Sequence, residues 1–170
     1  MSDRRTPHIP EPDLIAELDQ AREELNRIGR QRLQRLGITL EAELRIGGLG
    51  VQRIQASGRT YLPDPMGFRA LIVPAWRGVP PSIYDGTTGA PLVDLIAFRT
   101  DRPWEWWYRL AALFCVLGDH HLQLAHWHGA SVTLHPDPLS FLQAEGRGAF
   151  LAEWCEHCLA EPVDTTREAA

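Results

Sequence analysis

The residues of this chain best suited to bind a metal are its histidines and cysteines. Four of the seven histidines lie within nine residues, and two of the three cysteines form a C-x-x-C pair: His120, His121, His126, His128, Cys155 and Cys158. Zinc in proteins takes imidazole and thiolate ligands, usually four around one point. One possible zinc site therefore combines Cys155 and Cys158 with His121 and His128.

The spacing of these ligands weighs against a simple zinc site. Two ligands on one helix should be three or four residues apart, and no pair of the clustered histidines has that spacing. His121 and His128 share a helix face but lie roughly 10 Å apart along the axis. Cys155 and Cys158 have no second C-x-x-C pair, so Cys115 together with one histidine would have to complete their site through folding. Otherwise the pair is a redox dithiol or two reduced thiols.

No catalytic residue is assigned. The serines lack the G-x-S-x-G turn of a serine hydrolase. Four acidic residues between positions 94 and 119 suit helix caps and loop charges: Asp94, Asp101, Glu105 and Asp119. Three tryptophans could stack a base or a sugar. At helical spacing Trp104 and Trp107 belong to the core, which leaves Trp106 exposed for that purpose.

The composition excludes several classes of enzyme. All 17 basic residues are arginine, and lysine is absent. Schiff-base enzymes, P-loop NTPases and kinases each need a lysine amine, so the chain is none of these. Together with many alanines, glycines and prolines, this composition indicates a GC-rich genome, that of a bacterium or one of its phages.

The charge and hydropathy of the chain indicate a cytoplasmic protein. A net charge of −5 argues against a general nucleic-acid or membrane-surface protein, because both of those partners are anionic. The first residues show no secretory signal, and the longest apolar run, 110–117, is too short to span a bilayer.

An amphipathic helix is predicted over residues 11–37. Leu14, Leu18, Ala21, Leu25 and Ile28 recur at spacings of four and three, which places them on one face. Acidic residues dominate the first half of the helix and arginines the second, as the helix dipole favours. The apolar face either packs on its own domain or pairs with a second copy or another protein. The arginines could also contact phosphates, an alternative that the net charge disfavours.

The rest of the chain alternates short elements. β-Branched residues and turn formers predict an antiparallel meander within residues 38–100, with strands at 43–55, 68–73 and 92–98. A helical turn is predicted from Pro103, and residues 113–117 form a strand. Then come a helix at 120–128, with Asp119 as its N-cap, a strand at 131–135, a helix at 136–144 and a strand at 148–152.

The predicted fold is α+β, with an N-terminal amphipathic helix, an antiparallel meander and a small βαβαβ half that completes a mixed sheet. The chain divides into a disordered start (1–10), a helical arm (11–37), one α+β domain (38–159) and a flexible tail (160–170). We expect a non-enzymatic accessory or protein-interaction protein, with a protein partner or second copy on helix 11–37. Two alternatives stay open: a small metal- or thiol-dependent enzyme using Cys155, Cys158 and the histidines, and a nucleic-acid-associated protein using the arginine-rich arm. No cofactor is expected apart from the possible zinc.

Overall fold

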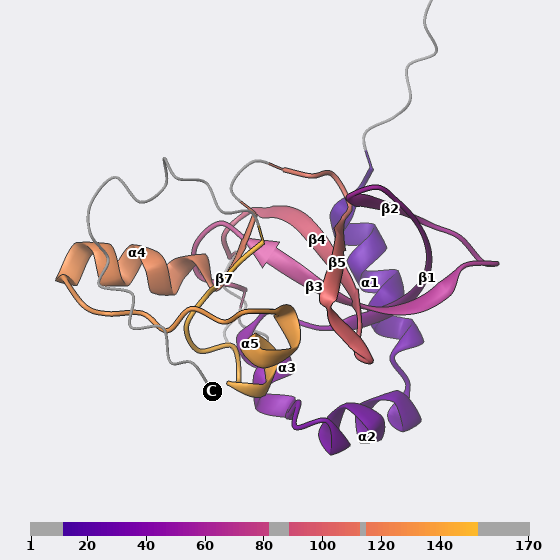
Figure 1. Cartoon of the computed structure of the whole chain (residues 1–170), viewed down its shortest axis with the longest axis horizontal. Helices are drawn as coiled ribbons and strands as arrows, with labels where there is room; N and C mark the ends of the chain where they lie inside the picture. Colours follow the sequence, from indigo (N-terminus) through magenta and orange to yellow (C-terminus); the bar gives the residue numbers. More distant parts are fainter. Residues whose placement is uncertain (1–11, 82–88, 113–114, 153–170) are drawn as a thin grey trace, which may run out of the picture.

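Five strands close into a small barrel at the centre of the molecule (Figure 1). The computed structural model describes residues 12–81, 89–112 and 115–152. The strands are β1 (Gly50–Ser57), β2 (Thr60–Pro63), β3 (Phe68–Trp76), β4 (Leu92–Arg99) and β5 (Arg102–Tyr108). The predicted start at 1–10, the tail at 160–170 and the Cys155–Cys158 pair lie outside the described residues.

The strand order around the barrel is β1-β2-β5-β4-β3. Four of the five neighbouring pairs are antiparallel, and β2 with β5 is parallel. An odd number of strands cannot alternate in direction all the way round a ring, so one parallel contact is required. It is short, with Thr60 opposite Tyr108. The predicted α+β fold, with a mixed sheet, is confirmed.

The middle strands β3 and β4 separate two parts of the core. Leu71 and Val73 of β3 belong to one buried cluster, and Ala70 and Ile72 belong to the other. This division follows from the alternation of side chains along a strand. Both faces of β3 and β4 are covered, which explains why their sequences are continuous apolar runs rather than alternating ones.

The N-terminal segment forms two helices where the sequence predicted one. They are α1 (Leu14–Glu24) and α2 (Arg27–Arg35). The chain turns at Asn26, whose side chain accepts a hydrogen bond from the Gly29 amide at 2.9 Å and so caps α2. A Cβ atom at Gly29 would lie 2.9 Å from the Leu25 side chain, so glycine permits this close turn.

The apolar stripe of α1 packs on its own domain. Leu18, Ala21 and Leu25 are all buried, the first two in the cluster with β3 and β4. Ile28 belonged to the same predicted stripe, but it lies beyond the turn and is 62% exposed on α2. The turn at Asn26 therefore divides the segment into a packed helix and a largely exposed one.

Residues 102–108 correct the sequence analysis, because they form strand β5 and not a helical turn. Their partners lie in β4, where Ala97 is opposite Trp107 and Phe98 is opposite Trp106. Aromatic residues favour strands, and pairing with β4 decides between the two structures. The strand predicted at 43–55 begins only at Gly50, because Leu40–Arg45 form α3 with Thr39 as its N-cap.

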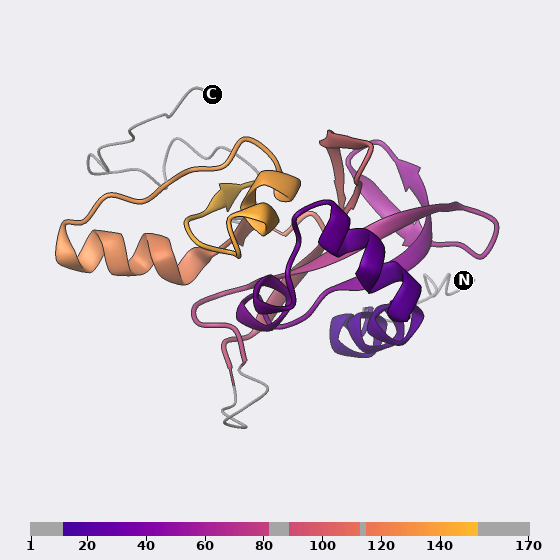
Figure 2. The same ribbon diagram turned by 90° about the horizontal axis from the view of Figure 1, so that it is seen from below.

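The chain after the barrel follows the predicted alternation of elements. Strand β6 (Val116–Leu117) leads to α4 (Asp119–His128), and α5 (Pro138–Gln143) precedes β7 (Phe150–Leu151). The two strands pair with each other as a separate small sheet, and the strand predicted at 131–135 is a single bridge from Leu134 to Ala149. Helix α4 extends away from the barrel in both views (Figures 1 and 2). Gly118, in a left-handed conformation, is its N-cap, and Asp119 is its first residue.

Across the described ranges, no helix combines the length and the apolar character needed to cross a bilayer.

Candidate functional site

The structure places the four clustered histidines on α4. The rings of His120 and His121 lie 3.9 Å apart, and His121 Nε2 is 3.1 Å from the carbonyl oxygen of Gly146. His126 and His128 are exposed near the end of the helix. Within the described part of the chain, no three histidine, cysteine or acidic residues could hold one metal ion. The site of Cys155, Cys158, His121 and His128 stays a prediction, because its two cysteines lie outside that part.

The acidic residues around positions 94–119 serve as structural caps and ion-pair partners. Asp94 is fully buried and accepts hydrogen bonds from four backbone amides. Asp101 pairs with Arg99, and Asp119 accepts bonds from the Gly78 amide and Gln123. Asp101 is a loop charge, as expected. Asp94 is instead a buried acceptor within β4, and Asp119 is the first residue of α4 rather than its cap.

The exposure of the β5 tryptophans agrees with the sequence prediction for Trp107 but not for Trp104 and Trp106. Trp104 is 65% exposed, whereas Trp106 and Trp107 are partly buried against Phe150 and Phe68, with ring centroids 5.0 and 5.3 Å apart. A strand places Trp104 and Trp107 on opposite faces, whereas the helical spacing assumed from the sequence had assigned them to one face. The exposed Trp104 lies in a shallow hollow with Arg59 and Glu105.

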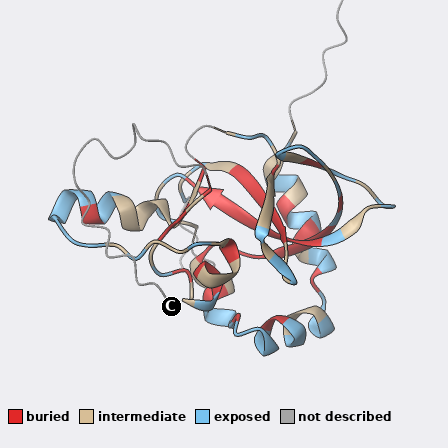
Figure 3. Cartoon of the chain, in the orientation of Figure 1, coloured by how far each residue is buried: buried red, intermediate tan, exposed pale blue. Residues whose placement is uncertain are grey.

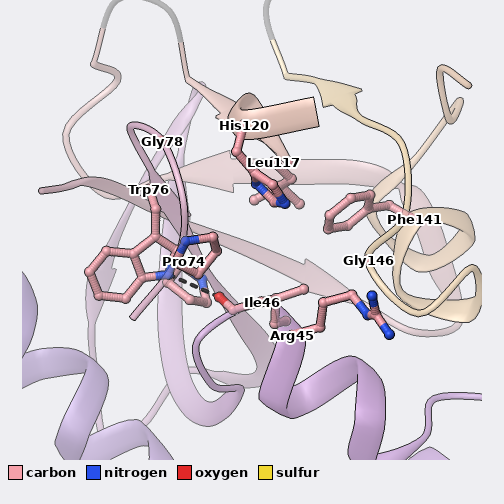
Figure 4. Close-up of a pocket in the computed structure, with 11 residues that line it drawn as sticks. Arg45, Ile46, Pro74, Trp76, Gly78, Leu117, His120, Phe141 and Gly146 are labelled. Carbon is pink, nitrogen blue, oxygen red and sulfur yellow. Dashed lines mark hydrogen bonds between the residues drawn. The ribbon is translucent and has the colours of Figure 1, made fainter. Parts of the chain in front are cut away.

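A small cavity lies where the barrel meets α4 and α5 (Figure 4). At its edge Trp76 Nε1 donates a hydrogen bond of 2.9 Å to the carbonyl oxygen of Ile46, which ties the end of β3 to the end of α3. Its volume of about 10 Å³ is that of one water molecule, so it cannot take a substrate.

Burial controls the protonation of the histidine in this cavity. It lowers the pKa of His120 to about 4, and the positive charges of His121 and Arg45 act in the same direction. The pKa of His121 is also lowered, mainly by burial. His120 is therefore neutral at pH 7, and the cavity is a packing junction with a titratable residue.

A much larger groove runs between α2 and the strands β1, β3 and β4. Its volume is about 530 Å³. Apolar side chains from helices and strands line it: Leu25, Ile28, Leu33, Leu36, Val51, Phe68, Leu71 and Phe98. Ile28 and Leu36 are 62% and 37% exposed at the helix side, and Figure 3 shows α2 largely in the colour of exposed residues. We call this feature the α2 groove.

Unpaired arginines border the α2 groove. Arg99 is paired with Asp101 at 2.6 Å, but Arg32 and Arg69 form no side-chain hydrogen bond or ion pair within the described ranges. Arg69 also lies directly opposite Arg53 in the β1–β3 ladder, and both are exposed. Like charges directly opposite each other destabilise a strand pair, so an anion at this position would relieve repulsion.

The groove was not visible from the sequence. The arginines of α2 were recognised as a group, but Arg69 and Phe98 come from strands that meet α2 only in the folded chain. No protein-family model, curated protein or solved structure matches the chain. The geometry of the α2 groove is therefore the only support for it as a candidate site.

Proposed function

We propose that this chain is a cytoplasmic, non-enzymatic accessory protein that binds an acidic amphipathic segment of a partner protein in the α2 groove. The observation that carries the proposal is an apolar groove bordered by arginines without ion-pair partners among the described residues. From the sequence we expected a protein partner on residues 11–37. The proposal places that partner on the second half of this segment, at α2.

The apolar lining supports a protein segment as the ligand. Amphipathic helices commonly bind by laying apolar residues, spaced three and four apart, into a hydrophobic groove. The volume of about 530 Å³ suits several such side chains. Ile28 and Leu36 are available for contact at the edge, because α2 buries only Leu33.

The charge of the groove supports an acidic ligand and argues against a second copy. Helix α2 holds four arginines and no acidic residue, and among the described residues only Arg30 is paired, with Glu43 at 3.0 Å. Two copies joined through α2 would bring these arginines together, and like-charge contacts oppose association. A nucleic acid would satisfy the arginines but would leave the apolar lining without a matching surface.

Selection from a random peptide library on the immobilised full-length chain tests this proposal. Acidic peptides with apolar residues at spacings of three and four should be enriched. The double variant Arg32→Glu, Arg69→Glu should bind them at least about tenfold more weakly, since two charge-assisted contacts become repulsive. Arg77→Glu, an exposed charge reversal outside the groove, is the matched control and should leave binding unchanged.

Three results would overturn the proposal. One is the absence of any enriched peptide, and another is enrichment that survives the double variant. The third is tighter binding of a single-stranded oligonucleotide than of any selected peptide, with affinity that falls steeply as salt rises, as phosphate contacts require.

A further inference from the structure

Helix α4 has few buried contacts with the other residues that the structure describes. Of its ten residues only Ala125 is buried. Its first turn is held by the bond from the Gly78 amide to Asp119 and by the contact of His121 with Gly146. Beyond these residues the helix extends from the body of the molecule, and Figure 3 shows its far end exposed apart from one buried position. A helix this short is marginal in water without packing.

The exposed part of α4 carries two large apolar residues on one face. Trp127 is 80% exposed and Leu124 is 51% exposed. They are three residues apart, so they are neighbours on the helix surface. A tryptophan offers about 200 Å² of contact area at this exposure, and tryptophan is among the residues that contribute most to protein interfaces.

The sequence on either side of Trp127 is poor in charged residues. No Asp, Glu or Arg occurs from His120 to Pro136, whereas 23% of the whole chain is charged. The residues after the helix, Gly129 to Ser131 and Thr133, are exposed and also uncharged. A standard interface needs about 800 Å² of surface from each partner. The exposed residues of this segment add to the contact surface that Leu124 and Trp127 provide.

A second copy of this chain is the partner that such a surface fits. In a two-fold interface the same patch meets itself, so any charge in it would meet a like charge. The stretch from His120 to Pro136, which includes both apolar residues, has no Asp, Glu or Arg. The acidic segment proposed for the α2 groove would find no cation here, so the two surfaces call for different partners.

We propose that two copies of the chain associate through α4, with Leu124 and Trp127 at the centre of a two-fold interface. The α2 groove is formed by other elements and stays open in this dimer. The proposal is therefore independent of the proposed function.

Sedimentation equilibrium of the full-length chain at pH 7.5 tests the dimer. We expect dimers at micromolar concentration. Trp127→Glu should weaken association at least about 100-fold, because it places two carboxylates in the centre of the interface. Trp104→Glu is the matched control, since it changes an exposed tryptophan on another element, β5, and should leave the dimer intact.

A second measurement excludes loss of folding as the cause. The reference is wild-type protein diluted below its dissociation constant, which is monomeric. Trp127→Glu should have the same far-ultraviolet circular dichroism and the same urea unfolding midpoint as this sample. A wild-type chain that is monomeric at about 0.5 mM overturns the proposal. So does a dimer that withstands Trp127→Glu, or one that Trp104→Glu disrupts equally. Peptide binding in the α2 groove is unaffected by any of these results.

Discussion

Glu17 of α1 and Arg109, at the end of the barrel, form an ion pair of 2.7 Å although 92 residues separate them in the chain. Their side chains are only 9% and 13% exposed. The other oxygen of Glu17 accepts a hydrogen bond of 3.1 Å from the Tyr61 hydroxyl. Burial, and then the charge of Glu17, raise the pKa of Tyr61, so its hydroxyl stays a donor. This network fixes α1 to the barrel.

Replacing Glu17 by alanine should lower the free energy of unfolding by about 3 kcal/mol. The reason is that a mostly buried guanidinium would lose its partner, a loss that costs more than the intact pair contributes. Urea unfolding of the two proteins measures the difference. Asp19→Ala is the control on the same helix, because its pair with Arg22 is exposed and should contribute less than about 1 kcal/mol. Equal effects of the two substitutions would contradict the assigned role.

His120 should make the fold sensitive to mild acid. Burial lowers its folded-state pKa to about 4, while the unfolded chain keeps a value near 6.5. Between these values the unfolded state binds more protons, so stability falls as the pH decreases from about 6.5 to about 4 and the loss levels off below that. The lowered pKa of His121 acts in the same direction.

Unfolding in urea at pH 7.5 and pH 4.5 measures this dependence for the wild type and for His120→Gln. The variant cannot titrate at this position and should show a smaller difference between the two pH values. His126→Gln changes an exposed histidine of the same helix and should behave as the wild type. A pH dependence that His120→Gln leaves unchanged would assign the acid sensitivity to other groups.

Local signals in the sequence predicted the elements that depend on nearby residues. Helix α4 ends at Gly129, which adopts the left-handed conformation expected after a helix, and Asp137 caps α5 just before Pro138. The N-cap Asn26 was missed, because the apolar spacing across it favoured one continuous helix. The strand character of β5 was missed for a different reason. The residues of Trp104–Tyr108 fit both periodicities, and only the pairing with β4 selects the strand.

The candidate sites depended on contacts between distant segments and were therefore less predictable. The sequence showed that α2 is rich in arginine, but not that β1, β3 and β4 would supply the apolar side of a groove. It also selected Trp106 as the exposed tryptophan of β5, whereas Trp104 is the exposed one. The closure of the barrel is another such long-range contact, since it pairs Thr60 of β2 with Tyr108 of β5.

Substitutions of Asp94 can separate the contribution of its hydrogen bonds to stability from that of its negative charge. Its Oδ1 accepts hydrogen bonds from the amides of Leu95, Arg109 and Leu110, and its Oδ2 accepts one from Ala112, all at 2.8–3.0 Å. Asp94→Ala would remove the acceptor of the Leu95, Leu110 and Ala112 amides, whereas the Arg109 amide would keep its bond of 2.9 Å to the Leu95 carbonyl oxygen. Each buried unpaired donor costs about 1–3 kcal/mol, so this variant should lose at least about 3 kcal/mol of unfolding free energy.

Asp94→Asn keeps one carbonyl oxygen and replaces the other oxygen by an amino group. The retained oxygen can take the place of Oδ1 and its three bonds, while the amino group would oppose the Ala112 amide. We therefore expect a loss smaller than that of Asp94→Ala but larger than about 1 kcal/mol. Urea unfolding of both variants at pH 7 measures this order. If Asp94→Asn were as stable as the wild type, the bond to Ala112 would contribute nothing. If it were as unstable as Asp94→Ala, the negative charge, rather than the number of acceptors, would hold residues 109–112 against β4.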